Sequence, residues 1–349
     1  MLLGKPSKQI MADVIDRFTG AKSSNIIVGP KLGVDVSVLR IDNRRVMIVS
    51  CDPVSFIPSM GPDASARMSV YEVASDVATS GIPPKYAMID LNLPPQISDS
   101  LLTRYWKSFH SACLELGLSI VGGHTGRFQG CDYSVIGGAT LWVSCGDREY
   151  VTSMMARDGD DLILTKSAAF GATSVLTKAF PETVRKAIGP SLFEKARTYF
   201  SHSNIVTDAI TAASAGIHQR GVTAMHDATE GGITAALLEM AEASGLGGSV
   251  FLDDIPISDE TRQLCKFFRI DPLVSLGEGC LVVACSPHRT DAVIGRLRSR
   301  RIDATVVGRL SSKIRRMYGV TRRGRARLRY PTVDPYWRAY WKAVERGWS

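Results

Sequence analysis

The sequence AMHDATEGGI, at residues 224–233, joins an apolar strand to a helix through a loop that holds an acid and two glycines. A helix N-terminus presents free N–H groups and a positive dipole, and glycine lets a phosphate approach the backbone closely. A carboxylate beside such a turn, here Asp227, is typical of magnesium sites, because Mg²⁺ takes a few carboxylate oxygens together with nucleotide phosphates. The stretch therefore fits one edge of a magnesium–nucleotide site.

Three more segments likewise place an acidic residue in a turn, at the end of a strand or on a helix. Asp35 follows a glycine-rich turn, and Asp52 comes at the end of an apolar strand, where Pro53 is expected to stop the ladder and turn the carboxylate outward. Glu72 and Asp76 are one turn apart on a predicted helix and therefore share a face. Each segment alone is a weak signal, since a loop aspartate more often caps a helix or a turn. Together the aspartates fit a site formed where distant segments converge.

A fifth segment, IVGGHTG at residues 120–126, follows a predicted strand and adds glycines, a hydroxyl and an imidazole. It is either a functional loop or a plain strand-ending turn in which His124 is a hydrogen-bonded surface histidine. The residues alone leave both readings open.

Hydrophobic periodicity predicts a mixed α/β chain. The expected strands are residues 26–28, 34–39, 46–50, 86–91, 119–121, 133–143, 162–165, 222–225, 249–252, 280–285 and 304–307. The expected helices are residues 64–80, 100–116, 171–180, 205–217, 232–244 and 289–300. A chain of 349 residues exceeds one average domain. We expect an N-terminal domain over residues 1–150, a second domain over 151–330 and a tail over 331–349.

The composition is that of an ordinary globular protein, with 45% hydrophobic and 22% charged residues. No apolar run approaches the roughly 18 residues needed to span a bilayer. Residues 1–8 lack the apolar core of a secretion signal, so we expect a cytoplasmic location and no membrane partner. Seven cysteines without a CxxC pair argue against a disulfide framework and against a zinc ribbon.

The net charge of +8 is concentrated near the C-terminus, at Lys313, Arg315, Arg316, Arg322, Arg323, Arg325, Arg327 and Arg329. The alternation over residues 325–330 predicts an edge hairpin with one solvated face, where arginine also blocks strand-to-strand aggregation. No recognised nucleic-acid motif accompanies the stripe, so nucleic-acid binding is not expected. An acidic protein partner at 313–329 is a further hypothesis.

The last segment is aromatic. Asp334 can cap a helix that starts at Pro335 and carries Tyr336, Trp337, Tyr340 and Trp341 at spacings of three and four. Such a stripe is more often packing surface than chemistry, because aromatic residues dominate both cores and interfaces. We expect this helix to dock on the body of the protein or on a dimer mate.

The order of these segments resembles the AIR synthase-like (PurM-like) superfamily, and within it most closely the hydrogenase maturation factors of the HypE family. The matching segments are GVDVS at 33–37 for the GxDxA element, CDPV at 51–54 for TDP, SDVATSGIP at 75–83 for NDxAxxGxxP, GGHT at 122–125 for GGHT/GGDT, and HDATEGG at 226–232 for HDPTRGG. Five matches in the correct order span nearly the whole chain. Neither a P-loop nor a Rossmann GxGxxG motif competes with this assignment.

The resemblance implies a PurM-like architecture, in which an N-terminal α/β domain pairs across a homodimer and Mg-ATP lies between this domain and a second α/β domain. It implies metal ligands at Asp35, Asp52, Asp76 and Asp227, a phosphate loop at Gly122, Gly123, His124 and Thr125, further nucleotide contacts at Asp35, Asp52, Asp76, Thr229, Glu230, Gly231 and Gly232, and catalytic roles for Asp52, Asp227 and His226.

The chain departs from its relatives at three places. Ser75 replaces the usual asparagine, and Glu230 replaces the arginine of the HypE motif. HypE carries its substrate on a C-terminal cysteine, whereas this sequence ends ERGWS and its last cysteine is Cys285. Selenophosphate synthetase, another relative, needs a reactive cysteine near its N-terminus, and the first cysteine here is Cys51.

These observations predict a HypE-like ATP-dependent enzyme that uses Mg-ATP to phosphorylate or activate an amide-like or other small group. The catalytic task would be mainly positioning and charge neutralisation. Two alternatives stay open: a non-catalytic nucleotide-binding scaffold, and hydrogenase maturation with the acceptor thiol supplied by a partner.

Overall fold

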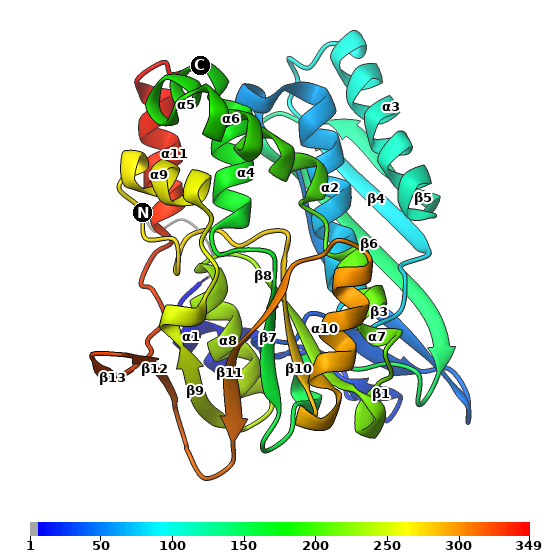
Figure 1. The fold of residues 1–349 in the computed structure, drawn as a ribbon. Helices are drawn as coiled ribbons and strands as arrows, with labels where there is room; N and C mark the ends of the chain where they lie inside the picture. The colour runs from blue at the N-terminus through cyan, green and yellow to red at the C-terminus, as the bar shows by residue number, and fades with distance from the viewer. Residues whose placement is uncertain (1–5) are drawn as a thin grey trace.

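The computed structural model describes residues 6–349, so the expectation about a secretion signal falls partly on residues 1–5, outside the described part. The protein is a mixed α/β structure built on two sheets, which confirms the predicted fold class (Figure 1). Within residues 6–349 no helix combines the length and the apolar character that crossing a bilayer requires.

The first sheet contains six strands in the order β1-β2-β3-β6-β4-β5, of which only β4 and β5 are parallel neighbours. Its strands are β1 (Ile26–Val28), β2 (Ser37–Arg40), β3 (Arg45–Phe56), β4 (Tyr86–Leu93), β5 (Ser119–Arg127) and β6 (Ser134–Gly146). Burial alternates along β3 and β4, as the period of a strand with one covered face requires. The covered face packs against α2 (Gly61–Ala78) and α3 (Asp99–Leu116) (Figure 1).

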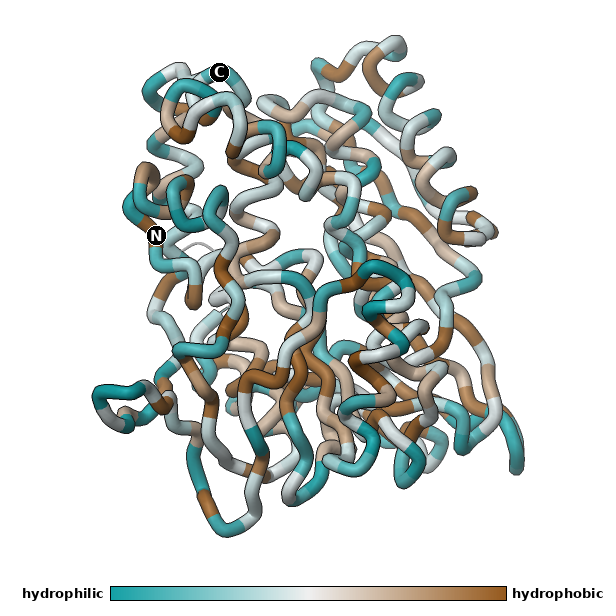
Figure 2. The backbone as a smooth tube through the Cα atoms, viewed as in Figure 1, coloured by the Kyte–Doolittle hydropathy of each residue, from teal (hydrophilic) through white to brown (hydrophobic). Residues whose placement is uncertain are grey.

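The second sheet contains seven strands in the order β13-β12-β9-β11-β7-β10-β8. Its strands are β7 (Asp161–Thr165), β8 (Val222–Ala228), β9 (Gly247–Phe251), β10 (Cys280–Cys285), β11 (Ala304–Ser311), β12 (Met317–Thr321) and β13 (Gly324–Arg327). Strands β7, β8 and β10 are buried along their whole length, which explains why they read as continuous apolar runs. Hydrophobic residues accordingly follow these central strands (Figure 2).

Helices cover the second sheet and close the top of the molecule (Figure 1). They are α4 (Phe170–Ala179), α5 (Pro181–Ile188), α6 (Pro190–Arg197), α7 (Val206–Ala213), α8 (Gly232–Ala243), α9 (Asp259–Phe268), α10 (Thr290–Ser299) and α11 (Pro335–Glu345), with a short α1 (Lys8–Ile10) near the N-terminus. The short helices α5, α6 and α9 were not expected, because each is rich in charged residues and buries only a few side chains.

Helix α2 joins the two sheets. One side of it packs on the first sheet, and Val77 belongs to the same core as Met225 of β8 and Ile205 just before α7. Serine hydroxyls tie the helix to β3: Ser69 Oγ accepts from Ser55 N at 2.8 Å, and Ser65 Oγ accepts from Ile57 N at 2.9 Å. These bonds fix the face of α2 that carries Glu72 and Asp76 relative to the end of β3.

Two local expectations are wrong. Strand β3 does not stop at Pro53 but continues to Phe56. Its neighbour β2 pairs only as far as Val49, so beyond that point β3 has a partner on one side, where proline is tolerated. The glycine segment at 122–126 is not a loop either, since β5 runs on to Arg127 and pairs with β4 along its length.

Candidate functional site

A cavity of about 600 Å³ lies where β3, α2, β8 and α11 meet. The four aspartates Asp35, Asp52, Asp76 and Asp227 all line it. Asp52 comes from β3, Asp76 from α2 and Asp227 from β8, while Asp35 lies in the loop before β2. Segments almost two hundred residues apart in the chain therefore form one acidic cluster. The roles of these aspartates in binding metal and nucleotide remain predictions.

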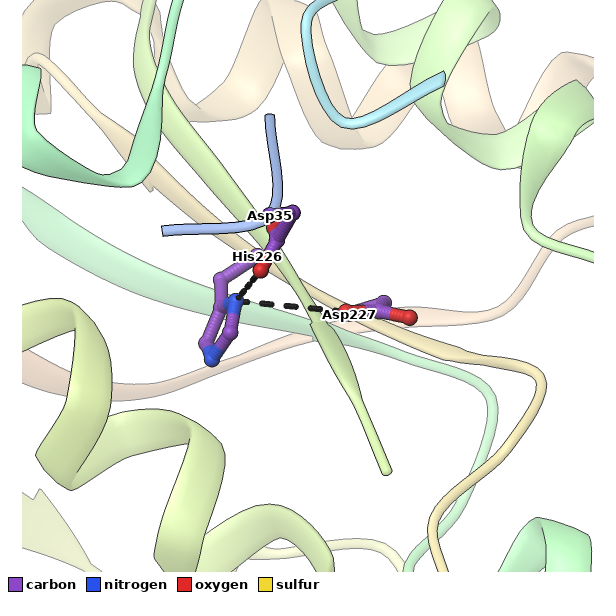
Figure 3. A group of neighbouring side chains, drawn as sticks. All are labelled: Asp35, His226 and Asp227. Carbon is purple, nitrogen blue, oxygen red and sulfur yellow. Dashed lines mark ion pairs between the residues drawn. The ribbon is translucent and has the colours of Figure 1, made fainter. Parts of the chain in front are cut away.

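Asp35, His226 and Asp227 form the tightest part of this cluster (Figure 3). His226 Nδ1 lies 2.6 Å from Asp35 Oδ1 and 3.9 Å from Asp227 Oδ1. The 2.6 Å contact is an ion pair rather than an aligned hydrogen bond, because neither His226 Nδ1 nor Asp35 Oδ2 has a hydrogen-bond partner of acceptable geometry among the described residues. A buried carboxylate oxygen without a donor is a fitting ligand for a cation.

His226 is held in its charged form. The ring is only 3% exposed, and its Nε2 lies 3.0 Å from Glu239 Oε2 on α8. Burial alone would lower the pKa of His226, but the carboxylates of Asp35 and Glu239 outweigh it and raise the pKa to about 10. A protonated imidazole offers no lone pair, so a metal ion here would be held by the oxygens of Asp35 and Asp227.

Burial and neighbouring carboxylates raise the pKa of other acidic residues in the cavity. Burial, followed by the charges of Asp227, Asp52 and Asp35, raises the pKa of Asp76 well above its ordinary value. Burial, followed by Asp52, raises the pKa of Glu72 to about 8. Carboxylates enclosed together repel one another, and a divalent cation relieves that repulsion. The donor set therefore fits magnesium, which prefers oxygen ligands.

The turn after β8 lies beside this cluster. Thr229 and Glu230 line the cavity, whereas Gly231 and Gly232 shape the turn. Gly231 has φ of +79°, a conformation that favours glycine, and its N–H donates to Asp334 Oδ2 at 2.8 Å. A phosphate at this helix start would have to share or displace that carboxylate.

The segment Gly122, Gly123, His124 and Thr125 lies away from the cavity. It is exposed on β5, an edge strand of the first sheet, and the described residues that line the cavity include none of the four. A Cβ on Gly123, whose φ is +148°, would lie 1.8 Å from Ile89 O, so glycine is required there by the neighbouring strand. Within one chain the structure does not bring this segment to the aspartates.

Two parts of the cavity were missed by sequence reasoning. Helix α11 docks on the body of the protein as expected, with Tyr336 and Tyr340 in its core. The sequence did not predict that Tyr336, Trp337, Tyr340 and Trp341 also line the cavity. Glu239 was not selected, although an acid in the middle of the buried helix GITAALLEMAEA was a usable signal. An acid is buried at that position only when a partner compensates its charge.

Comparison with known proteins identifies the family. The N-terminal domain of the AIR synthase related protein family matches residues 33–143, and its C-terminal domain matches residues 157–316. A putative hydrogenase expression/formation protein of Methanocaldococcus jannaschii is 25% identical over 95% of this chain and 96% of its own length. Carbamoyl dehydratase HypE of Rhizobium leguminosarum bv. viciae is 26% identical over 78% of this chain and 75% of its own length.

A solved structure of the hydrogenase maturation protein HypE in complex with ATP shares the fold. Its TM-score is 0.64 at 19% identity, and the match covers 95% of this chain and 97% of that one. The two sheets, the order of the motifs and both family matches support the same family assignment. The chain belongs to the AIR synthase related protein family and has its PurM-like two-domain fold.

Proposed function

We propose that this protein is a HypE-like, magnesium-dependent enzyme that uses ATP to phosphorylate or activate an amide-like or other small group. The observation that carries the proposal is the meeting of Asp35, Asp52, Asp76 and Asp227 in one cavity. The relationship to ATP-using members of the family supports it. The acceptor is an untethered small molecule or a group borne by a partner protein.

Each residue has a defined task in this proposal. Asp35, Asp52, Asp76 and Asp227 would hold the magnesium. Bound magnesium would neutralise the charge that develops on the transferred phosphoryl group. His226, fixed between Asp35 and Glu239, orients the Asp35 carboxylate. The α11 wall limits the access of water to the acceptor.

Titration calorimetry of the protein with ATP, with and without magnesium, tests this proposal. We expect binding that depends on magnesium, because ATP alone would bring negative charge into an acidic cavity. Absence of ATP binding under both conditions would reject the enzyme and leave a scaffold that keeps only the fold. Binding without turnover on any acceptor would favour the non-catalytic nucleotide-binding alternative.

Mg-ATP binding will release protons. The raised pKa of Asp76 means that its carboxyl group keeps its proton to a higher pH than an ordinary aspartate does, whereas a metal ligand must be ionised. Affinity for Mg-ATP therefore increases as pH rises. Calorimetry in two buffers of different ionisation enthalpy measures the number of protons released, and Asp76→Asn should remove that release. Equal heats in both buffers for the wild type would show that Asp76 does not ionise on binding.

We also propose a homodimer formed through the uncovered face of the first sheet. Met88 of β4, Val121 of β5 and Val135 of β6 are 48%, 53% and 57% exposed on that sheet. Val135 also lines the cavity, so the cavity opens toward this face. A phosphate role for the β5 segment 122–125 would then require that β5 of one copy lie against the cavity of its partner.

Charge placed on this face will separate the dimer. We expect Val121→Glu with Val135→Glu to convert a dimer into a monomer, because two buried carboxylates would be left without partners. Light scattering coupled to size-exclusion chromatography measures the mass. Leu114→Glu, at a residue 65% exposed on α3, is the matched control. A wild-type monomer at micromolar concentration would contradict the proposal.

The basic hairpin is a further surface for which we propose an acidic protein partner. Residues 313–329 include eight basic residues and no acid, so the charge of this segment equals the net charge of the whole chain, +8. The hairpin projects from the second sheet and is hydrophilic (Figures 1 and 2). Strand β13 is exposed throughout, and the guanidinium of Arg325 lies 3.8 Å from the centre of the Tyr318 ring. Within residues 6–349 none of its arginines forms an ion pair.

Charge reversal tests this surface. We expect polyglutamate to bind the wild type and to lose about tenfold or more in affinity for Arg322→Glu/Arg323→Glu, with binding that weakens as salt increases. Arg44→Glu/Arg45→Glu, on the opposite sheet, is the control. Preferential binding of polyuridylate over polyglutamate would indicate a nucleic-acid surface instead.

A further inference from the structure

Helix α11 gives the cavity an aromatic wall. Tyr336, Trp337, Tyr340 and Trp341 all line it, at positions that share one face of the helix. The rings contact one another, with centroids 5.2 Å apart for Tyr336 and Trp337 and 5.3 Å apart for Tyr340 and Trp341. Tyr336 and Tyr340 are buried, whereas Trp337 is partly exposed and Trp341 is 38% exposed, so a ligand could reach the two tryptophans.

This wall is held in place before any ligand binds. Trp337 Nε1 donates to Glu230 Oε1 at 3.1 Å, in the turn that follows β8. The Tyr340 hydroxyl lies 2.8 Å from Ser59 Oγ, in the segment before α2. The wall is thus anchored to both halves of the chain. Little side-chain freedom would be lost when a flat ligand settles against it, which favours binding.

The charge of the cavity indicates which class of ligand could bind beside the nucleotide. Eight of its lining residues are acidic, and they are Asp35, Asp52, Glu72, Asp76, Asp227, Glu230, Glu239 and Glu278. The basic lining residues are Lys31 and His226. Lys31 Nζ already donates to Ala243 O, and His226 lies between two carboxylates. Because Mg-ATP is itself close to charge balance with two magnesium ions, nucleotide binding would leave the cavity acidic.

Glu72 places one of these carboxylates at the aromatic wall. It lies on α2, one turn before Asp76, and lines the cavity together with Met68, Ile57 and Tyr336. Burial, then the charges of Tyr340 and Glu72, raises the pKa of Tyr336 well above its ordinary value. Among the described residues no cationic side chain forms an ion pair with Glu72.

We propose that Glu72 and the α11 wall form the acceptor subsite of the enzyme, and that this subsite takes a flat organic cation. An aromatic face attracts a cation through its quadrupole. The buried Glu72 carboxyl group becomes the counter-ion when the bound cation favours its ionised form. The chemical class is an aromatic or heteroaromatic ring that carries a fixed or protonated nitrogen cation. This inference rests on the function proposed above, because it names the acceptor for the same cavity.

A cationic probe and its uncharged counterpart test the subsite. Calorimetry with 1-methylquinolinium and with quinoline, each added to protein saturated with magnesium and a non-hydrolysable ATP analogue, gives two dissociation constants. We expect the cation to bind about tenfold or more tightly than quinoline. Glu72→Gln should reduce that preference to about twofold or less, and Trp337→Leu should weaken the binding of the cation about tenfold.

Matched variants separate a binding role from a structural one. Trp348→Leu removes a tryptophan that packs on Phe267 and Phe268 rather than in this cavity, and it should leave both dissociation constants unchanged. Trp337→Phe keeps an aromatic ring and should retain most of the affinity, which covers the case in which Trp337→Leu fails to fold. Circular dichroism of each variant confirms its folding.

The outcomes distinguish this inference from the proposed function. Failure of the wild type to bind Mg-ATP would reject both. Binding of Mg-ATP together with equal affinity for the cation and for quinoline would overturn only the cationic acceptor. A cation preference that survives Glu72→Gln would also overturn it, because the counter-ion would then lie elsewhere.

Discussion

Replacing both Asp52 and Asp227 by asparagine will weaken Mg-ATP binding at least about 100-fold, since removal of even an outer-shell partner costs about 10–100-fold in metal affinity. Asparagine keeps the shape of each side chain but removes the charge that holds magnesium. Both carboxylates line the cavity, and both contribute to the raised pKa of Asp76, so the three carboxyl groups interact electrostatically. Calorimetry with ATP at saturating magnesium measures the loss.

The same double variant should unfold at a higher temperature than the wild type when magnesium is absent. Enclosed carboxylates repel one another, and removing two of them relieves that repulsion. Asp147→Asn, at an exposed site on a turn, is the isosteric control and should change neither property. Mg-ATP affinity that stays within twofold of the wild type in the double variant would show that these aspartates do not hold the metal.

Replacing His226 by leucine will lower the free energy of unfolding by about 3–5 kcal/mol, the cost of removing one partner from a buried ion pair. The change leaves Asp35 and Glu239 buried without the cation that lies 2.6 Å and 3.0 Å from them. Guanidinium unfolding at pH 7 measures the loss. Adding Glu239→Gln to His226→Leu should recover part of it, because one uncompensated charge disappears.

The pH dependence of stability gives an independent check of this pair. The pKa of His226 in the folded protein, about 10, lies above the value of about 6.5 for an unfolded chain. The stabilisation is therefore fully present below about pH 6.5 and is lost as pH rises toward 10. The difference in unfolding free energy between wild type and His226→Leu should shrink across that window. A difference that stays constant would mean that His226 is neutral in the fold.

The fold could be read from the sequence to a large extent. Buried strands such as β7 and β10 appear as continuous apolar runs, and α8 begins where the glycines of AMHDATEGGI allow a sharp turn. These features are local, because burial and backbone freedom are properties of a few neighbouring residues. Pro53 shows the limit of local patterns. Whether this proline ends strand β3 depends on whether the neighbouring strand β2 pairs with β3 at that position, and it does not.

The sequence by itself determined the mixed α/β fold class and the four aspartates of the motifs, because strand and helix periods and short motifs depend on adjacent residues. The tertiary structure alone decided which of the acids share a cavity, that Glu239 compensates His226, that Gly122 to Thr125 lie apart on β5, and that α11 supplies a wall. These are contacts between segments far apart in the chain. Their geometry follows from how α2, β8 and α11 pack together, and no local pattern records it.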